Sequence, residues 1–271
     1  MKGDENMKAF DFEYANRKLS DFGCILCNFG GSKGIETVSD GCEITFNTVP
    51  TMRGTKNNLT STQYEECLET TLQICKHSCN GGIQEITESE HRELTKWLGR
   101  KKFLKFKILD ENHIDLYYEA ALIISKIEID GRLFGLELVV KTNRPFSLKE
   151  PRIITIKNTQ VDGKHSINDT SYEEGYIYPH MEITIGQDGD LKIYNALEDR
   201  YTNILKCTAG EVITLDYPMI NSSNSSHDIQ NNFNWKFFRI ANTYENSRND
   251  LTISLPCTIK IEYSPIVKVG L

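Results

Sequence analysis

The most regular hydrophobic pattern in the chain runs from Tyr117 to Thr142 and predicts two long antiparallel strands. Asp130-Gly131 separates the strands and suits the positive φ angles of a type I′ turn. The resulting register pairs Ile129 with Arg132, Ile127 with Phe134, Ser125 with Leu136, Ile123 with Leu138 and Ala121 with Val140. One face is then almost wholly apolar, and Leu122 and Val139 make the base of the other face apolar as well. We therefore expect this ribbon to pack against a large surface, in its own domain or on a neighbouring subunit.

One segment has helical spacing. Thr87-Glu-Ser-Glu90 has the form of a capping box, and Leu94, Trp97 and Leu98 follow at helical intervals up to Gly99. We expect Trp97 to anchor this helix in the core, because large aromatic side chains mostly serve cores.

Shorter segments of the first half alternate as strands do or form apolar runs bounded by turn residues. The predicted strands are Ala9–Tyr14, Asp21–Asn28, Glu43–Val49, Cys67–Cys79 and Phe103–Leu109, with 50–58 expected as a polar loop.

The second half of the chain predicts a separate all-β unit. The segment 143–151 holds two prolines and few alternating apolar residues, so we place the domain boundary there, between domains 1–147 and 148–271. Several short strands with turns between them and no helix favour a sandwich. The fold class is therefore mainly β, with an α+β first domain, a sheet or barrel carrying one helix and the long hairpin, followed by a β-sandwich.

Three features of this second half can be predicted in more detail. Met181–Asn195 is expected to be a hairpin whose three-residue loop, 187–189, pairs Ile185 with Leu191 and Ile183 with Ile193. The segment 252–263 is expected to be one strand with its odd-numbered residues facing inward and Pro256 marking an edge or a bulge. The polar segment 221–232 is expected to be a mobile surface loop.

Charge and hydropathy exclude some classes of protein. The formal net charge of −7 argues against a nucleic-acid-binding surface, which gathers Lys and Arg. No apolar run approaches the ~20 residues that cross a bilayer, and the start MKGDENMKAF has no apolar signal-peptide region. We therefore expect no membrane contact and reduced thiols in a cytosol-like compartment.

The cysteines raise the possibility of a metal site. Cys24-x-x-Cys27 and Cys75-x-x-x-Cys79, with His77, could supply zinc ligands. Against this interpretation, the first pair lies in a strand-like run, where residues three apart point to opposite faces. We favour buried, inert thiols and expect no metal and no cofactor.

No residue set predicts catalysis. The chain has no G-x-S-x-G or H-E-x-x-H motif, and the adjacent acids Glu173 and Glu174 cannot flank a scissile bond from both sides. Asp188 and Asp190 are too few oxygens for calcium. Trp235, Phe237 and Phe238 could form a sugar-stacking platform, but we expect them to fill the sandwich core. We therefore expect no enzymatic activity and assign no catalytic, cofactor or metal residues.

Four stretches of the chain resemble the distal tail proteins (Dit) of phages that infect Gram-positive bacteria. They are Ser20–Gly23, Tyr64–Cys79 (YEECLETTLQICKHSC), Lys126–Phe146 (KIEIDGRLFGLELVVKTNRPF) and Phe237–Gly270. They occur in this order and span both halves of the chain.

The resemblance implies a structural tail-tip, or baseplate, hub of the virion that is made in the cytoplasm of the bacterial host. It implies a homo-hexameric ring built by the first domain, with a galectin-like or carbohydrate-module-like sandwich outside. The implied partners are the tail tube protein, the tail-associated lysin or spike and receptor-binding proteins, with no direct nucleic-acid binding. An alternative is a carbohydrate-binding adsorption module that recognises cell-wall sugars; a cell-wall hydrolase is a third possibility.

Overall fold

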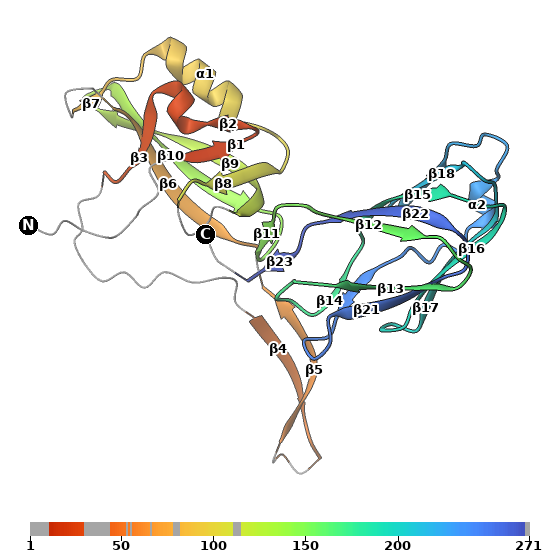
Figure 1. The fold of residues 1–271 in the computed structure, drawn as a ribbon. Coiled ribbons are helices and arrows are strands. Elements are labelled where there is room, and N and C mark those ends of the chain that lie inside the picture. The colour runs from red at the N-terminus through yellow and green to blue at the C-terminus, as the bar shows by residue number, and fades with distance from the viewer. Residues whose placement is uncertain are drawn as a thin grey trace, which may run out of the picture. The chain divides into compact units, whose positions relative to one another are not determined.

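The computed structural model describes residues 11–29, 44–52, 54, 56–65, 67–77, 82–110 and 115–268. The chain divides into two compact units, residues 1–148 with 268–271 and residues 149–267 (Figure 1). Over the described ranges, no helix is both long and apolar enough to span a membrane.

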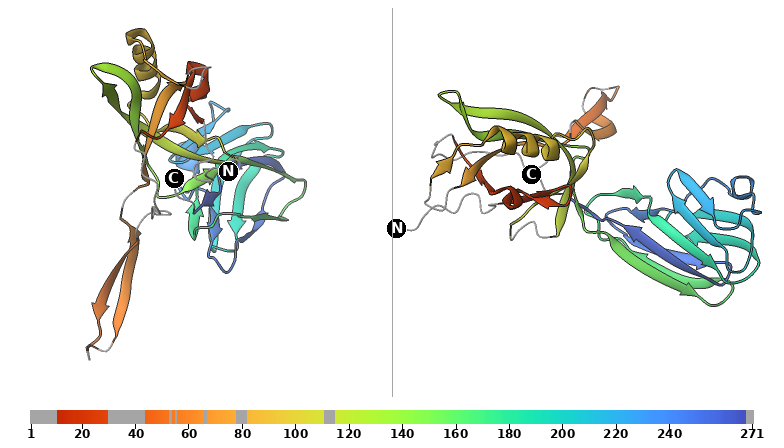
Figure 2. Two further views of the ribbon diagram at one scale, coloured as in Figure 1. Left: turned by 90° about the vertical axis from the view of Figure 1, so that its left-hand side faces the viewer. Right: turned by 90° about the horizontal axis from the view of Figure 1, so that it is seen from above.

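The first unit is built on one antiparallel sheet with a helix on one face (Figure 2). Its strands follow the order β2-β1-β8-β9-β10-β6-β3, with β7 beside β6 and β11 beside β9. The elements of this unit are β1 (Phe12–Tyr14), β2 (Arg17–Lys18), the 3-10 helix η1 (Leu19–Phe22), β3 (Cys24–Cys27), β4 (Ile44–Pro50), β5 (Asn57–Tyr64), β6 (Glu69–His77), β7 (Ile83–Gln84), α1 (Glu88–Leu98), β8 (Leu104–Ile108), β9 (Leu116–Ile129), β10 (Arg132–Thr142) and β11 (Ser147–Lys149). Because β2 and β3 do not pair, the sheet is open among the described strands and forms no barrel.

Helix α1 follows the prediction closely. The Thr87 hydroxyl accepts a hydrogen bond from the backbone N–H of Glu90, the Glu90 carboxylate accepts one from the backbone N–H of Thr87, and Gly99 ends the helix. Trp97 is buried, stacks on Phe22 with ring centroids 4.4 Å apart, and donates its indole N–H to the carbonyl of Tyr14 at 2.8 Å. Trp97 is therefore the core anchor that the sequence predicts.

The long hairpin β9–β10 has the predicted turn but a different register. Asp130 and Gly131 both have positive φ, and Arg132 lies opposite Ile129 as expected. A bulge at Phe134 then shifts every later pair by one residue. The pairs observed beyond it include Gly135 with Ile127, Leu136 with Lys126, Leu138 with Ile124, Val139 with Ile123 and Val140 with Leu122.

The shifted register puts a different set of β9 side chains inside. Tyr118, Ala120 and Leu122 of β9 pack beside Leu138 and Val140 in the core, whereas Ile123 is 53% exposed. The predicted apolar face that combined Ile123 with Leu138 is therefore wrong, because the extra residue at the bulge reverses the facing of one strand against the other. The base of the ribbon is a core element of its own domain.

A second hairpin, β4–β5, forms a separate two-stranded ribbon, which we call the arm (Figure 1). The sequence predicts a strand at Glu43–Val49 but a polar loop at 50–58, so the return strand β5 was missed. Most residues of the arm are exposed, on β4 as well as on β5.

The second unit is the predicted two-layer sandwich. One sheet has the order β12-β22-β15-β18-β19 and the other β13-β21-β16-β17, with the short pair β14–β20 beside them. Their inward-facing apolar residues form one continuous core. The elements are β12 (Arg152–Asn158), β13 (Gly163–Asn168), β14 (Gly175–Ile177), β15 (His180–Ile185), β16 (Gly189–Asn195), β17 (Arg200–Cys207), β18 (Val212–Asp216), β19 (Met219–Ser222), α2 (Ile229–Asn232), β20 (Ile240–Asn242), β21 (Arg248–Ile253), β22 (Cys257–Tyr263) and β23 (Ile266–Val267).

Two predicted connections in this sandwich are wrong in the same way. Strands β15 and β16 do not pair as a hairpin: β15 pairs with β18 and β22, and β16 with β17 and β21. The predicted single strand 252–263 is likewise divided, with β21 in one sheet and β22 in the other. Both segments cross between the layers at neighbouring points, where the N–H of Gly186 donates to the carbonyl of Pro256 at 2.8 Å.

Candidate interaction surfaces

The cysteines considered as zinc ligands are not arranged around a common point. Cys24 and Cys27 lie on β3, where they pair with Lys76 and Gln73 across the sheet, and therefore point to opposite faces. No group of three or more His, Cys, Asp or Glu that could hold a metal occurs in the part of the chain that the structure describes; Cys79 lies outside it. Burial raises the pKa of the Cys24 thiol to about 11, which keeps this thiol protonated and unreactive.

The acidic candidates serve local structure. Asp188 accepts a hydrogen bond from the N–H of Ala209 at 2.7 Å, and Asp190 accepts one from the N–H of Lys206 at 2.9 Å. Glu173 and Glu174 lie side by side before β14, and Glu173 accepts a hydrogen bond from the hydroxyl of Tyr244 at 3.2 Å. None of these four acids lines either of two pockets found among the described residues, whereas glycoside hydrolysis needs two acids that flank a bound sugar.

The three aromatic candidates of the sandwich differ in burial. Phe237 and Phe238 are buried in the core, as predicted. Trp235 is 56% exposed, so its assignment to the core is wrong. Its backbone has a positive φ of 56°, which is uncommon for a residue other than glycine.

Trp235 belongs to a continuous row of rings that we call the aromatic strip. The ring centroid of Phe237 lies 6.4 Å from Trp235 and 5.3 Å from Tyr217, and Tyr217 stacks on Tyr178 at 4.0 Å. Tyr176 meets Tyr178 edge to face. The exposed members are Tyr176, Tyr217 and Trp235, each more than half exposed.

The charge beside the strip is already paired. The Arg239 guanidinium lies 3.8 Å from the ring centroid of Tyr176 and forms an ion pair with Glu198. Burial alone lowers the pKa of Arg239, but Glu198 and Tyr178 raise it above its ordinary value, so the guanidinium stays charged. The strip therefore presents neutral rings over an internal ion pair.

The polar segment 221–232 lies at the surface, as predicted, and a buried pair of side chains holds it to the sandwich. The His227 and Glu211 side chains are 2% and 0% exposed, and the Nδ1 of His227 lies 2.5 Å from the Oε1 of Glu211. The Nε2 of His227 lies 2.9 Å from the carbonyl of Leu205. Burial raises the pKa of Glu211, but hydrogen bonds from Ser222, His227 and Thr208 outweigh it and hold the pKa below its ordinary value.

The arm carries an apolar stripe along one face. Ile44 pairs with Tyr64, Phe46 pairs with Thr62, and a bulge in β5 brings Leu59 opposite Thr48 on the same face. Ile44, Phe46 and Leu59 are 44%, 63% and 58% exposed. Met52, between the two strands, is fully exposed. Apolar side chains lined up on a solvated ribbon mark an interaction surface rather than a core.

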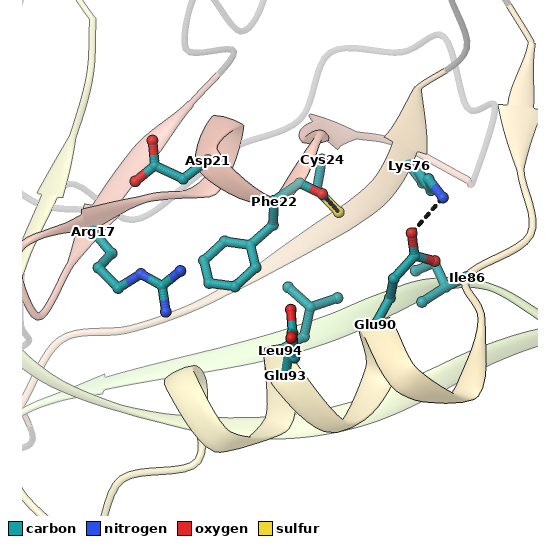
Figure 3. A pocket seen from close by; sticks show the side chains of 9 residues that line it. All are labelled: Arg17, Asp21, Phe22, Cys24, Lys76, Ile86, Glu90, Glu93 and Leu94. Atoms are coloured by element: carbon teal, nitrogen blue, oxygen red, sulfur yellow. Dashed lines mark hydrogen bonds and ion pairs between the residues drawn. The ribbon is translucent and has the colours of Figure 1, made fainter.

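A pocket of about 220 Å³ lies between α1 and the segment from β2 to β3 (Figure 3). Phe22, Ile86 and Leu94 form its apolar floor. The charged residues at its rim are Arg17, Asp21, Lys76, Glu90 and Glu93.

Two of the rim charges compensate each other. Lys76 lies 2.5 Å from Glu90, and its hydrogen bond lowers the pKa of Glu90 to about 2, so the carboxylate stays ionised. The guanidinium of Arg17 lies 4.2 Å from the ring centroid of Phe22. Within the described residues, no hydrogen bond or ion pair engages the carboxylate of Glu93. The pocket thus combines an apolar floor with an acidic side chain that is open to a partner.

Sequence reasoning missed both the arm and the pocket. The signal for the arm was available, because 44–64 alternates weakly on either side of a short turn and contains no acidic residue. The pocket residues come from separate segments that share no motif.

Comparison with known proteins finds two family profiles along the chain. A profile described as a phage tail protein N-terminal domain matches residues 7–144, and one described as a phage tail C-terminal domain matches residues 146–263. No curated protein matches the chain.

The fold is similar to a solved structure. The Dit protein (gp 19.1) of phage SPP1 superposes with a TM-score of 0.63 at 11% identity, covering 95% of this chain and 99% of that one. That protein is described as a paradigm of the hub adsorption apparatus in phages infecting Gram-positive bacteria. At this identity the likeness concerns the fold.

Proposed function

Because the chain belongs to the phage tail protein family, we propose that it is a structural hub of the tail tip whose copies close into a hexameric ring. The ring would join the tail tube protein to the tail-associated lysin or spike and carry receptor-binding proteins. It would act without catalysis and reside in the virion.

One observation carries this proposal. The arm exposes an apolar stripe that includes Phe46 on a ribbon with no third strand among the described residues. An isolated two-stranded hairpin is marginally stable in water. A contact with another chain would supply the missing burial, and in a closed homo-oligomer that chain is a second copy. The fold shared with a protein described as a hub adds support.

The test compares two substitutions on opposite faces of the arm. Phe46→Asp places a charge in the apolar stripe, whereas Gln63→Asp places the same charge on the other face of the neighbouring strand. We expect the wild type and Gln63→Asp to form rings of six by native mass spectrometry and negative-stain electron microscopy, and Phe46→Asp to remain monomeric. Since Phe46 is exposed within its own chain, the free energy of unfolding should change by less than about 0.5 kcal/mol.

The proposal fails if the wild-type chain stays monomeric at every concentration tested. If Phe46→Asp forms rings as readily as the wild type, the arm does not contribute to the contact between copies, and the proposed hub role is unaffected.

A second candidate function is carbohydrate recognition by the sandwich, favoured by the exposure of Trp235 and Tyr217. Exposed flat rings suit the apolar face of a sugar ring, and their polar atoms suit its hydroxyls. Trp235→Ala and Tyr217→Ala should then abolish binding to purified cell-wall polysaccharide in a pull-down, with the exposed Tyr244→Ala as the control. Absence of wild-type binding would remove this candidate.

A further inference from the structure

The arm and the pocket beside α1 are complementary in size and charge, and we infer that the pocket of one copy receives the arm end of the next copy. The arm end is defined here by Met52 and Lys56, and the pocket by the floor residues Phe22, Ile86 and Leu94 with Glu93 at the rim. The inference rests on the proposed ring and names the two surfaces that would form its contact.

The size of the pocket suits a single side chain. Its volume of about 220 Å³ lies below the ~300 Å³ at which small-molecule sites usually begin. Phe22 and Leu94 reach into it from opposite sides, so its floor is apolar (Figure 3). The fully exposed thioether of Met52 is unbranched and makes favourable contacts with aromatic rings such as that of Phe22.

The charges of the two surfaces are opposite. The pocket rim carries three acids and two bases, and because Lys76 is paired with Glu90, the carboxylate of Glu93 remains open among the described residues. The segment 44–64 contains two basic side chains and no acidic one, and the basic Lys56 is exposed. Complementary charge at the edge of an apolar contact fixes its register and its partner.

A charge exchange tests the pairing. Lys56→Glu and Glu93→Lys should each raise the concentration at which half of the chains are in rings, by up to about fivefold per contact. The double variant, in which the two charges are exchanged, should recover most of the loss. Glu88→Lys is the matched control, because Glu88 lies on the same helix, pairs with Arg92 and does not line the pocket.

Photo-crosslinking locates the arm end directly. A benzophenone amino acid at position 52, in rings mixed from isotope-labelled and unlabelled chains, should attach to peptides from 17–24 or 86–94 of a different copy. The labels separate contacts between copies from contacts within one.

The outcomes are distinguishable. Rings whose crosslinks lie elsewhere or within one copy, or single charge variants that assemble as the wild type does, overturn this inference and leave the proposed ring intact. Absence of wild-type rings overturns the proposed function and this inference together.

Discussion

Two antiparallel hairpins of the first unit, β9–β10 and the arm β4–β5, each contain one bulge, and their surroundings differ completely. β9–β10 pairs with β8 on one side and β6 on the other, and α1 covers one face. The arm β4–β5 pairs with no other described strand, and its apolar residues are solvated.

The difference shows where each hairpin obtains its stability. Leu138 and Val140 of β10 are fully buried, so β9–β10 is held by the hydrophobic core of its own chain. Phe46 of the arm is 63% exposed and has no such burial among the described residues. The bulge in the embedded hairpin sets which residues enter the core, whereas the bulge in the arm sets which residues share its exposed apolar face.

The largest expected effect on the free energy of unfolding comes from placing a charge on the buried face of β9. Leu122→Glu puts a carboxylate into the core and should lower the free energy of unfolding by about 4 kcal/mol or more. Ile123→Glu, one residue away on the exposed face, should change it by less than about 0.5 kcal/mol. Urea unfolding followed by circular dichroism measures both. Equal losses would mean that the facing of this hairpin is not the one described.

A smaller effect is expected at the bulge. A Cβ at Gly135 would lie 2.6 Å from the carbonyl oxygen of Ile74 and 2.7 Å from the Phe29 ring, so Gly135→Ala forces the backbone of β6 or β10 to move. We expect a loss of about 1–3 kcal/mol. Gly131→Ala is the control: its φ is positive but no atom lies within 4 Å, so only the ~1 kcal/mol left-handed strain applies. A Gly131→Ala variant that unfolds more readily than Gly135→Ala would contradict the close approach at the bulge.

The smallest effect concerns acid stability. The pKa of Glu90 lies below its ordinary value, so its contribution is complete above pH 4.5 and is lost as the pH falls through about 2. Its side chain is 38% exposed, and screening limits the contribution to less than about 1 kcal/mol. Glu90→Gln should flatten this part of the stability profile in thermal unfolding measured over that pH range.

Residues 44–64 of the arm contain no Asp, Glu or His, so none of their own side chains titrates in this pH range. An unchanged profile in Glu90→Gln would show that the capping interaction does not stabilise the helix that covers β9–β10.

Local signals in the sequence were sufficient for some elements. The capping box at Thr87 and the spacing of Leu94 and Trp97 locate α1, since these contacts lie within a few residues of one another. Alternation also identifies the buried faces of the sandwich, where Ile183, Ile193 and Ile259 all lie in the core.

Alternation does not say which strand lies beside which. A hairpin and a crossing between layers place Ile185 and Leu191 inward equally well, and the turn 187–189 is compatible with both. The shift at Phe134 was hidden for a related reason: both faces of that ribbon carry apolar residues, so a one-residue slip leaves a plausible pattern.

The candidate surfaces were harder to predict than the fold. The return strand of the arm is rich in Thr, Ser and Asn, because a ribbon without its own core needs no strict apolar face. Trp235 is exposed while Phe237 is buried, and the positive φ at Trp235 is not visible in the sequence pattern.

If the arm of one copy binds the pocket of the next, each contact joins two different surfaces, and the interface is heterologous. Such head-to-tail contacts close only when the turn from copy to copy divides a full circle, and otherwise they extend as a helix without end. The angle at the root of the arm, where Tyr64 meets Phe146 with ring centroids 6.1 Å apart, would then decide between a ring and a filament. In the proposed ring of six, the contact that closes the ring would form within one assembly, at an effective concentration far above that of free chains. Partly assembled rings would therefore be short-lived. The number of subunits in a ring would be set by the geometry of the contact and not by the protein concentration.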